Sequence, residues 1–149
     1  PGISDPGFLL VRECVEAGVA VECLPGSTAF VPALVVSGLP CDRFYFEGFL
    51  PHKKGRMKRL TWLMDMPCTV VLYESPHRVG KLLNQLDELG HGERRVSLSR
   101  ELSKLHEETL RGSVKDLLGA TEASAPRGEY VVVIEGTENL LKTQAAAAR

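Results

Sequence analysis

The sequence lacks the features that assign a chain to the simplest protein classes. It has no apolar run near the roughly 20 residues of a membrane-spanning helix. Its four histidines are scattered, without the spacing of metal ligands. It also lacks an excess of charge of one sign, with 18 Lys and Arg against 19 Asp and Glu. We therefore expect no membrane and no metal among its partners, and any nucleic-acid contact has to come from a local basic patch.

Paired cysteines are missing as well. No Cys-x-x-Cys motif occurs, and each of the four cysteines lies in or beside an apolar stretch: Cys14, Cys23, Cys41 and Cys68. This placement is typical of buried free thiols. It predicts a reducing, cytoplasmic environment.

The start of the chain is rich in turn residues. It reads Pro1-Gly2-Ile3-Ser4-Asp5-Pro6-Gly7, with no strand before it. Proline and glycine in this pattern let a chain leave a sheet, approach a ligand closely and enter a helix. The pattern indicates a segment of a larger protein, so any site shared with a preceding strand is expected to be present only in part.

The apolar periodicity predicts alternating helices and strands. A content of 44% hydrophobic residues is enough for a core. Spacing, caps and breakers predict helices at 6–17, 28–36, 58–64, 76–89 and 113–118, and strands at 19–24, 69–73, 95–99, 109–111 and 129–135, with 42–49 either a strand or an extended linker. Such alternation is typical of an α/β fold.

The best candidate for a domain boundary is the segment 50–56, where proline, glycine and charge cluster. We expect residues 1–49 to be the trailing part of a first α/β domain. Residues 57–136 then form a complete second α/β domain, and residues 137–149 are a tail without a core of its own.

Several motifs together carry a family likeness. They are the opening residues, Leu24-Pro25-Gly26-Ser27-Thr28-Ala29, Glu74-Ser75-Pro76-His77-Arg78, Arg100-Glu101-Leu102-Ser103-Lys104 and Gly128-Glu129. In this order they resemble the cytidine 2′-O-methyltransferases of bacterial small-subunit ribosomal RNA, within the tetrapyrrole methylase superfamily. The resemblance implies a two-domain α/β architecture. It also implies that an N-terminal strand with its glycine loop, and most of the region after Gly136, are missing.

The resemblance further implies a cofactor, S-adenosylmethionine, which lies in the cleft between the two domains and is held largely by backbone. Loops at the carboxyl ends of strands are where open α/β sheets bind ligands. Without the family, the turn at Ser27-Thr28 is more simply a helix cap. Mapped by motif, the cofactor contacts are Gly2, Ile3, Thr28, Ala29, Glu74 and Leu102.

The charged run 100–108 holds the candidate catalytic residues. Methyl transfer from a sulfonium needs orientation more than a metal. A ribose hydroxyl is a weak nucleophile at neutral pH, so a group must accept its proton or stabilise the oxyanion. The candidates are Lys104 as the electrostatic stabiliser and Glu101 or Glu107 as the base. The alternative is a solvated surface of ion pairs, which is typical of such charge runs.

Cations and aromatic residues cluster around the predicted boundary. The basic run 52–59 is flanked by Phe44, Tyr45, Phe46 and Phe49 upstream and by Trp62 downstream. Cations bind phosphates and aromatic rings stack on unpaired bases, so the cluster favours single-stranded or irregular RNA. The alternative is a charged hinge whose aromatic rings belong to the core.

A second cationic feature lies at the start of the predicted helix 76–89. Positive charge is disfavoured at the N-terminal end of a helix, which suggests a partner for His77 and Arg78. That partner is an RNA phosphate or a neighbouring chain's carboxylate, or else Arg78 pairs with Glu74 or Glu101 for structure alone. The predicted RNA contacts are Lys53, Lys54, Arg56, His77, Arg78 and Arg100.

The leading hypothesis is a methyltransferase that uses S-adenosylmethionine to methylate the ribose 2′-hydroxyl of a cytidine in small-subunit ribosomal RNA. One alternative is a tetrapyrrole or precorrin C-methyltransferase, which uses the same cofactor cleft. Another is a non-catalytic module for RNA binding or dimerisation. From the family we expect a homodimer, and we expect the isolated segment to be inactive because part of the cofactor site is missing.

Overall fold

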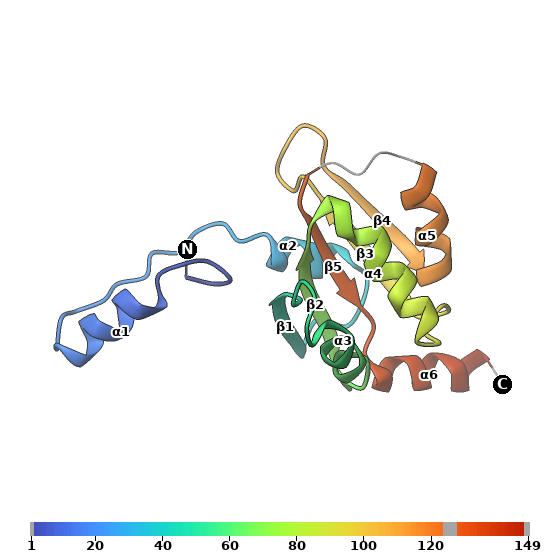
Figure 1. The fold of residues 1–149 in the computed structure, drawn as a ribbon, viewed down its shortest axis with the longest axis horizontal. Coiled ribbons are helices and arrows are strands. Elements are labelled where there is room, and N and C mark those ends of the chain that lie inside the picture. Colours follow the sequence, from blue (N-terminus) through green and yellow to red (C-terminus); the bar gives the residue numbers. More distant parts are fainter. Residues whose placement is uncertain (1, 124–127, 148–149) are drawn as a thin grey trace.

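A mixed five-stranded sheet forms the centre of the computed structural model, which describes residues 2–123 and 128–147 (Figure 1). The strands are β1 (Phe44–Phe49), β2 (Thr69–Glu74), β3 (Arg95–Arg100), β4 (Glu108–Ser113) and β5 (Tyr130–Ile134). Their order across the sheet is β1-β2-β5-β3-β4. β1 runs parallel to β2, and the other neighbours are antiparallel. The prediction of an α/β fold is confirmed.

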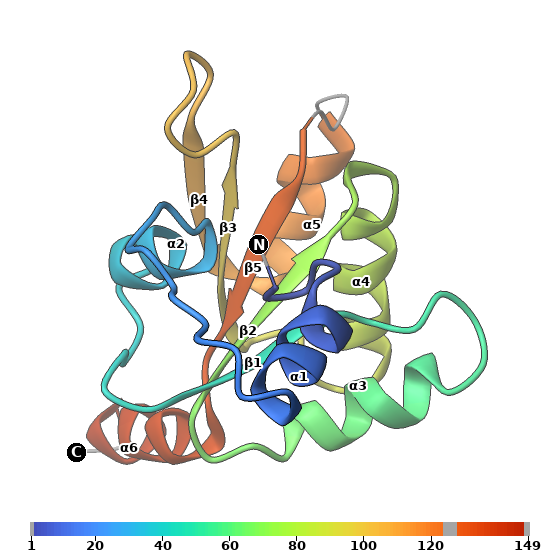
Figure 2. The same ribbon diagram turned by 90° about the vertical axis from the view of Figure 1, so that its left-hand side faces the viewer.

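Helices cover both faces of this sheet. They are α1 (Phe8–Glu16), α2 (Phe30–Val36), α3 (Arg56–Met64), α4 (Pro76–Glu88), α5 (Val114–Ala123) and α6 (Thr137–Ala147). α3, α4 and α5 lie on one face, whereas α2 lies on the other (Figure 1 and Figure 2). α1 lies apart from the sheet at the end of an extended segment (Figure 1).

The central strands are buried on both faces, as their unbroken apolar runs predict. Successive side chains of a strand point to opposite faces. In β2, Val70 and Leu72 pack with α3, α4 and α5, while Val71 packs with Ala33 and Leu34 of α2. All five residues of β5 are buried. Two apolar cores, one on each face, therefore share the same sheet.

The helix α4 illustrates how local sequence sets an element. The side chain of Ser75 accepts a hydrogen bond from the amide of His77, and Pro76 occupies the first turn, where its missing amide costs nothing. One face of the helix is buried against the sheet, and its members are Val79, Leu82, Leu83 and Leu86. The predicted helix 76–89 is confirmed.

The N-terminal arm, residues 2–28, differs from the predictions. α1 forms but buries no residue, and the expected strand at 19–24 is absent. A strand requires partners for its backbone groups, and within the described residues no strand pairs with this segment. The expectation of buried thiols is also wrong, because Cys23 and Cys41 are exposed and Cys14 and Cys68 are half-buried.

The predicted boundary at 50–56 connects two parts of one packed unit. β1, which precedes it, pairs with β2 in the same sheet, and Leu50 is buried in the core with α3. The division into domains stays a prediction. At the other end, the predicted tail forms α6, whose Thr137 amide donates to the Met66 carbonyl at 3.0 Å.

Candidate functional site

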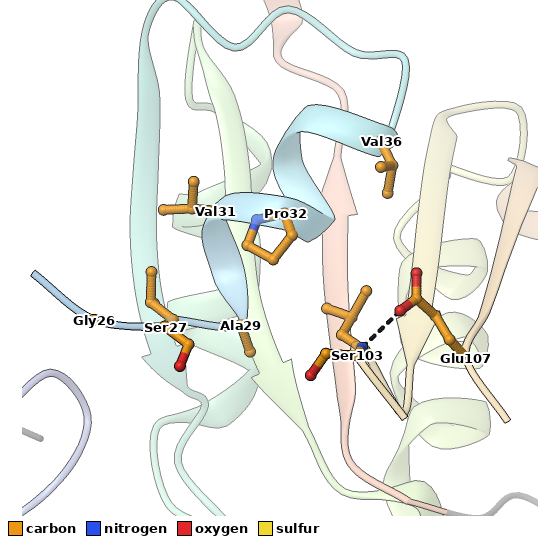
Figure 3. A pocket seen from close by; sticks show the side chains of 10 residues that line it. Gly26, Ser27, Ala29, Val31, Pro32, Val36, Ser103 and Glu107 are labelled. Atoms are coloured by element: carbon orange, nitrogen blue, oxygen red, sulfur yellow. Dashed lines mark hydrogen bonds between the residues drawn. The ribbon is translucent and has the colours of Figure 1, made fainter. Parts of the chain in front are cut away.

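A cavity of about 580 Å³ lies between the start of α2 and the loop that joins β3 to β4 (Figure 3). We call it the α2 cavity and the loop, residues 101–107, the β3–β4 loop. The cavity is lined by Gly26, Ser27, Thr28, Ala29, Val31, Pro32, Val36, Leu102, Ser103 and Glu107. Two segments far apart in the sequence therefore face one another across it.

The lining of the α2 cavity combines exposed backbone with apolar walls. Residues 26–29 have small side chains, so their backbone is accessible. Val31, Pro32 and Leu102 supply apolar surface, and Glu107 supplies a carboxylate. A volume of this size, with mostly apolar walls and a few polar groups, suits a nucleoside-sized amphipathic ligand.

The β3–β4 loop holds its shape through its own polar contacts. Glu101 and Ser103 have positive φ angles of 50° and 63°, which are uncommon for residues other than glycine. The Lys104 ammonium bonds the Glu101 carboxylate at 3.0 Å, and the Ser103 amide donates to Glu107 at 2.6 Å (Figure 3). These contacts position the carboxylate of Glu107 beside the cavity.

A second cavity of about 260 Å³ adjoins the first. It shares Ala29 and Leu102 with the α2 cavity, and the rest of its lining is Tyr73, Glu101, Lys104, Glu129, Tyr130 and Val131. The side chain of Glu101 lies against Gly128, where a Cβ atom would collide with it. The structure thus brings six of the predicted residues together around the two cavities: Thr28, Ala29, Glu101, Leu102, Lys104 and Glu107.

Glu74 lies outside these cavities, and its carboxylate is fully engaged. It accepts hydrogen bonds from Arg56 and Arg78, both at 2.8 Å, and from the amide of Ser75 at 2.9 Å. Glu74 is 1% exposed and Arg56 3%. Its carboxylate therefore offers no free side-chain contact to a ligand, and the contacts favour the structural interpretation of Arg78.

Gly2 and Ile3 do not join the other predicted cofactor contacts. They lie outside the lining of both cavities, and Ile3 is 61% exposed. Their neighbour Ser4 lies against Gly48 of β1, at a position where a Cβ atom would collide with the serine hydroxyl. The opening loop thus contacts the edge of the sheet.

The predicted RNA contacts fall into two groups. Lys53, Lys54 and His77 are exposed. Arg56 and Arg78 bond Glu74, as described above, and Arg78 also contacts the ring of His52. Arg100 bonds Glu108 at 2.6 Å, and this hydrogen bond raises the pKa of its guanidinium. Lys53 and Lys54 are therefore the predicted contacts with positive charge available to a phosphate.

Sequence reasoning missed Tyr73 and Tyr130 as lining residues of the second cavity. Tyr130 is 5% exposed, and this burial raises the pKa of its hydroxyl. Both residues lie near the ends of apolar strands, where the sequence pattern cannot distinguish an aromatic residue that lines a cavity from one in the core. The neighbouring motif Gly128-Glu129 was the only signal for this part of the site.

Two classes of feature are not found in the described part of the chain. No helix there is long and apolar enough to cross a membrane. No group of three or more His, Cys, Asp and Glu residues among those described is placed to hold a metal ion.

Comparisons with known proteins relate this chain to methyltransferases. The family described as Tetrapyrrole (Corrin/Porphyrin) Methylases matches residues 1–118. The Ribosomal RNA small subunit methyltransferase I of Mycobacterium tuberculosis (strain CDC 1551 / Oshkosh) is 47% identical over 139 residues, covering 91% of this chain and 48% of that protein. The protein of the same name from Thermotoga maritima is 42% identical over 138 residues, covering 93% and 62%. The chain thus spans about half the length of the curated relatives it matches, or somewhat more.

Solved structures match the fold. The uroporphyrin-III-C-methyltransferase of Thermus thermophilus has a TM-score of 0.61 at 24% identity, covering 96% of this chain and 63% of that one. A cobalt precorrin-4 methyltransferase has a TM-score of 0.63 at 19% identity, covering 86% and 57%. A further structure of the Thermus enzyme, in complex with S-adenyl homocysteine, has a TM-score of 0.59 at 18% identity, covering 95% and 64%. At these identities the likeness shows the fold alone.

Proposed function

Because the chain belongs to the tetrapyrrole methylase family, we propose that it is part of a methyltransferase that transfers a methyl group from S-adenosylmethionine to a ribose 2′-hydroxyl of small-subunit ribosomal RNA. The names of relatives at 42% and 47% identity support this substrate over a tetrapyrrole, whose methyltransferases match at 18% to 24%. The observation that carries the proposal is the convergence of Thr28, Ala29 and Leu102 on one cavity.

The residues of the α2 cavity fit the proposed cofactor. When bound, S-adenosylmethionine supplies an electrophilic methyl group on a sulfonium. The accessible backbone of 26–29 would hold its polar groups, and the side chain of Leu102 would contact its apolar parts. Contacts through backbone tolerate changes of side chain, which agrees with small residues at these positions.

The β3–β4 loop supplies the groups for the ribose hydroxyl. Glu107 is the proposed proton acceptor, because its carboxylate lines the α2 cavity. Glu101 is already bonded to Lys104 and lies against Gly128. Lys104 lines the adjoining cavity, where its ammonium would stabilise the developing oxyanion.

We also propose a homodimer and a cytoplasmic location. Ribosomal RNA as substrate implies the cytoplasm of a bacterial cell. A dimer interface is supported by the exposed apolar side chains of α2 and β1, since Val31, Val35 and Phe44 are 44%, 66% and 41% exposed. Sedimentation equilibrium checks the dimer: a single species of monomer mass across the concentration range would contradict it.

The test uses a completed chimera, in which the parts of the Mycobacterium tuberculosis relative that lie outside the match flank this chain. We expect the chimera to bind S-adenosylmethionine in calorimetric titration and to transfer a labelled methyl group to small-subunit ribosomal RNA. Ala29→Trp fills the space that the two cavities share, so we expect it to abolish both. Glu107→Gln should lower the transfer rate by about 10²-fold or more, with cofactor binding retained.

The control is Leu141→Trp, which places the same ring on α6 at a site that is 64% exposed and outside both cavities. It should leave cofactor binding unchanged. A folded chimera that binds no S-adenosylmethionine would contradict the proposal, as would equal losses in the two tryptophan variants.

A further inference from the structure

A third hollow, distinct from the α2 cavity, lies where the end of β1 meets α3. Its volume is about 530 Å³, and its lining is Glu47, Phe49, Pro51, Gly55, Lys58, Arg59 and Trp62. We propose that this Trp62 hollow binds an unpaired base of an RNA strand, stacked on the indole, with lysines on the flanking phosphates. The inference rests on the proposed function, because it names a part of the surface that would hold the RNA substrate.

The indole of Trp62 is held in place by its neighbours. The Arg59 guanidinium lies 4.2 Å from the centroid of the ring, and Tyr45 meets the ring edge-on at 5.5 Å. Arg59 is itself fixed by Glu47, with its two contacts at 2.7 and 2.8 Å, and by the Tyr45 hydroxyl at 2.8 Å. Trp62 nevertheless remains 42% exposed. A rigid aromatic ring with accessible surface is what base stacking requires.

A second exposed aromatic ring, that of Phe49, lines the same hollow. Phe49 lies at the end of the edge strand β1 and is 45% exposed. On its inner side it contacts Tyr73, with ring centroids 5.4 Å apart. By contrast, Leu60 and Leu63, which neighbour Trp62 on α3, are 0% exposed. The exposure of Phe49 and Trp62 therefore argues against the core interpretation for these two aromatics.

The charges around the hollow favour a polyanion as the occupant. The carboxylate of Glu47 neutralises the guanidinium of Arg59, so the net positive charge of the hollow comes from the lysines. Lys58 lines the hollow, and Lys53 and Lys54 lie on the loop that also supplies Pro51 and Gly55. In the part of the chain that the structure describes, these three lysines are exposed and make no ion pair. An apolar protein segment or a small acid would not use both the rings and the free ammonium groups.

The chain offers a direct readout, since Trp62 is its only tryptophan. We expect an unlabelled single-stranded RNA of about ten nucleotides to quench Trp62 fluorescence. The midpoint should equal that for the anisotropy of a labelled copy of the same RNA. An abasic strand of the same length retains the phosphates but not the bases, so it should bind more weakly and leave the fluorescence unchanged.

Two substitutions separate stacking from charge. Phe49→Ala removes the second ring that lines the hollow and should weaken RNA binding by about 10-fold, within the range for losing an aromatic contact to a base. Phe8→Ala is the control, because Phe8 is also exposed but lies in α1 and does not line the hollow. Lys58→Gln should lower the slope of log affinity against log salt concentration by about 0.7, the value for one phosphate contact to a single strand.

Three outcomes would overturn the inference. RNA binding without quenching would place the RNA elsewhere, and equal binding by the abasic strand would remove the base from recognition. If the folded chain binds no RNA, the proposed base-binding role of the hollow is contradicted, and a protein partner becomes the alternative occupant. The proposed function fails separately: a chimera that transfers no methyl group while RNA still quenches Trp62 would contradict the function alone, and the reverse result would contradict the hollow alone.

Discussion

The N-terminal arm and the packed sheet with its helices both carry apolar side chains but use them in opposite ways. In α1, Phe8, Leu9 and Leu10 are each more than 60% exposed. In α4, Leu82 and Leu83 are 0% exposed. Both helices form as their sequence patterns predict. Periodicity thus determines that a helix forms, whereas burial depends on whether another surface lies opposite it.

The α2 cavity lies at the junction of these two regions. One wall, residues 26–29, connects the arm to α2. The other wall belongs to the β3–β4 loop of the packed sheet. A ligand in this cavity would therefore contact both regions at once. This position explains why no single helix or strand reveals the site.

The largest expected effect comes from breaking the buried charge cluster of the sheet. Glu74→Ala leaves Arg56 buried without its carboxylate, so we expect a loss of about 3–5 kcal/mol in the free energy of unfolding. Urea unfolding followed by Trp62 fluorescence measures it. Glu93→Ala, which breaks an exposed pair with Lys115, is the control and should leave the midpoint nearly unchanged. Similar shifts in the two variants would contradict the burial of this cluster.

A matched leucine pair tests the comparison between the regions themselves. Leu83→Ala opens space in the core under α4 and should cost about 2–5 kcal/mol. Leu10→Ala in α1, where the side chain is 71% exposed, should change the free energy of unfolding by less than about 0.5 kcal/mol. Urea unfolding of both variants provides the measurement. A large cost at Leu10 would mean that the arm packs against something in solution.

Helix caps give a smaller contrast between the regions. Ser75→Ala removes the side-chain bond to the His77 amide at the start of α4 and should cost about 1 kcal/mol. Ser27 precedes α2, which has no side-chain cap. Ser27→Ala should therefore have no measurable effect on the free energy of unfolding. Thermal unfolding by circular dichroism resolves the difference. A cost at Ser27 equal to that at Ser75 would show a cap that the structure does not contain.

The smallest effect is a dependence on pH at the start of α5. The Ser113 hydroxyl and then its amide hold the pKa of Asp116 below its ordinary value of 3.8. Because the folded-state pKa is the lower one, Asp116 stabilises the fold above pH 3.8, and this contribution is lost as the pH falls through the folded value. Asp116→Asn should therefore flatten the change in the unfolding midpoint between neutral and acidic pH, and an unchanged profile would contradict the assignment.

Much of the sheet region could be predicted from the sequence. The apolar runs of β2 and β5 identify buried strands, and Ser75-Pro76 identifies the start of α4. The strand expected at 19–24 is absent because no described strand pairs with it, and the local pattern carries no information about a pairing partner. The same limit explains the exposed Cys23.

The candidate site was only partly predictable. Thr28, Ala29 and Leu102 were assigned from the family resemblance, and their roles stay predictions even though they line one cavity. The burial of Arg56 could not be seen, since an arginine in a basic run is usually exposed and its partner Glu74 is distant in the sequence. The exposure of Trp62 likewise depends on packing that no local pattern reports.

Hydrogen–deuterium exchange on the completed chimera, with and without S-adenosylhomocysteine, is the most direct test of a cofactor site at the junction of the arm and the sheet. We expect the ligand to slow exchange at 26–31 and at 101–105 together, while α5 remains unchanged. Ligand binding with slower exchange confined to other segments, or to one of these two walls only, would contradict a site shared between the two regions.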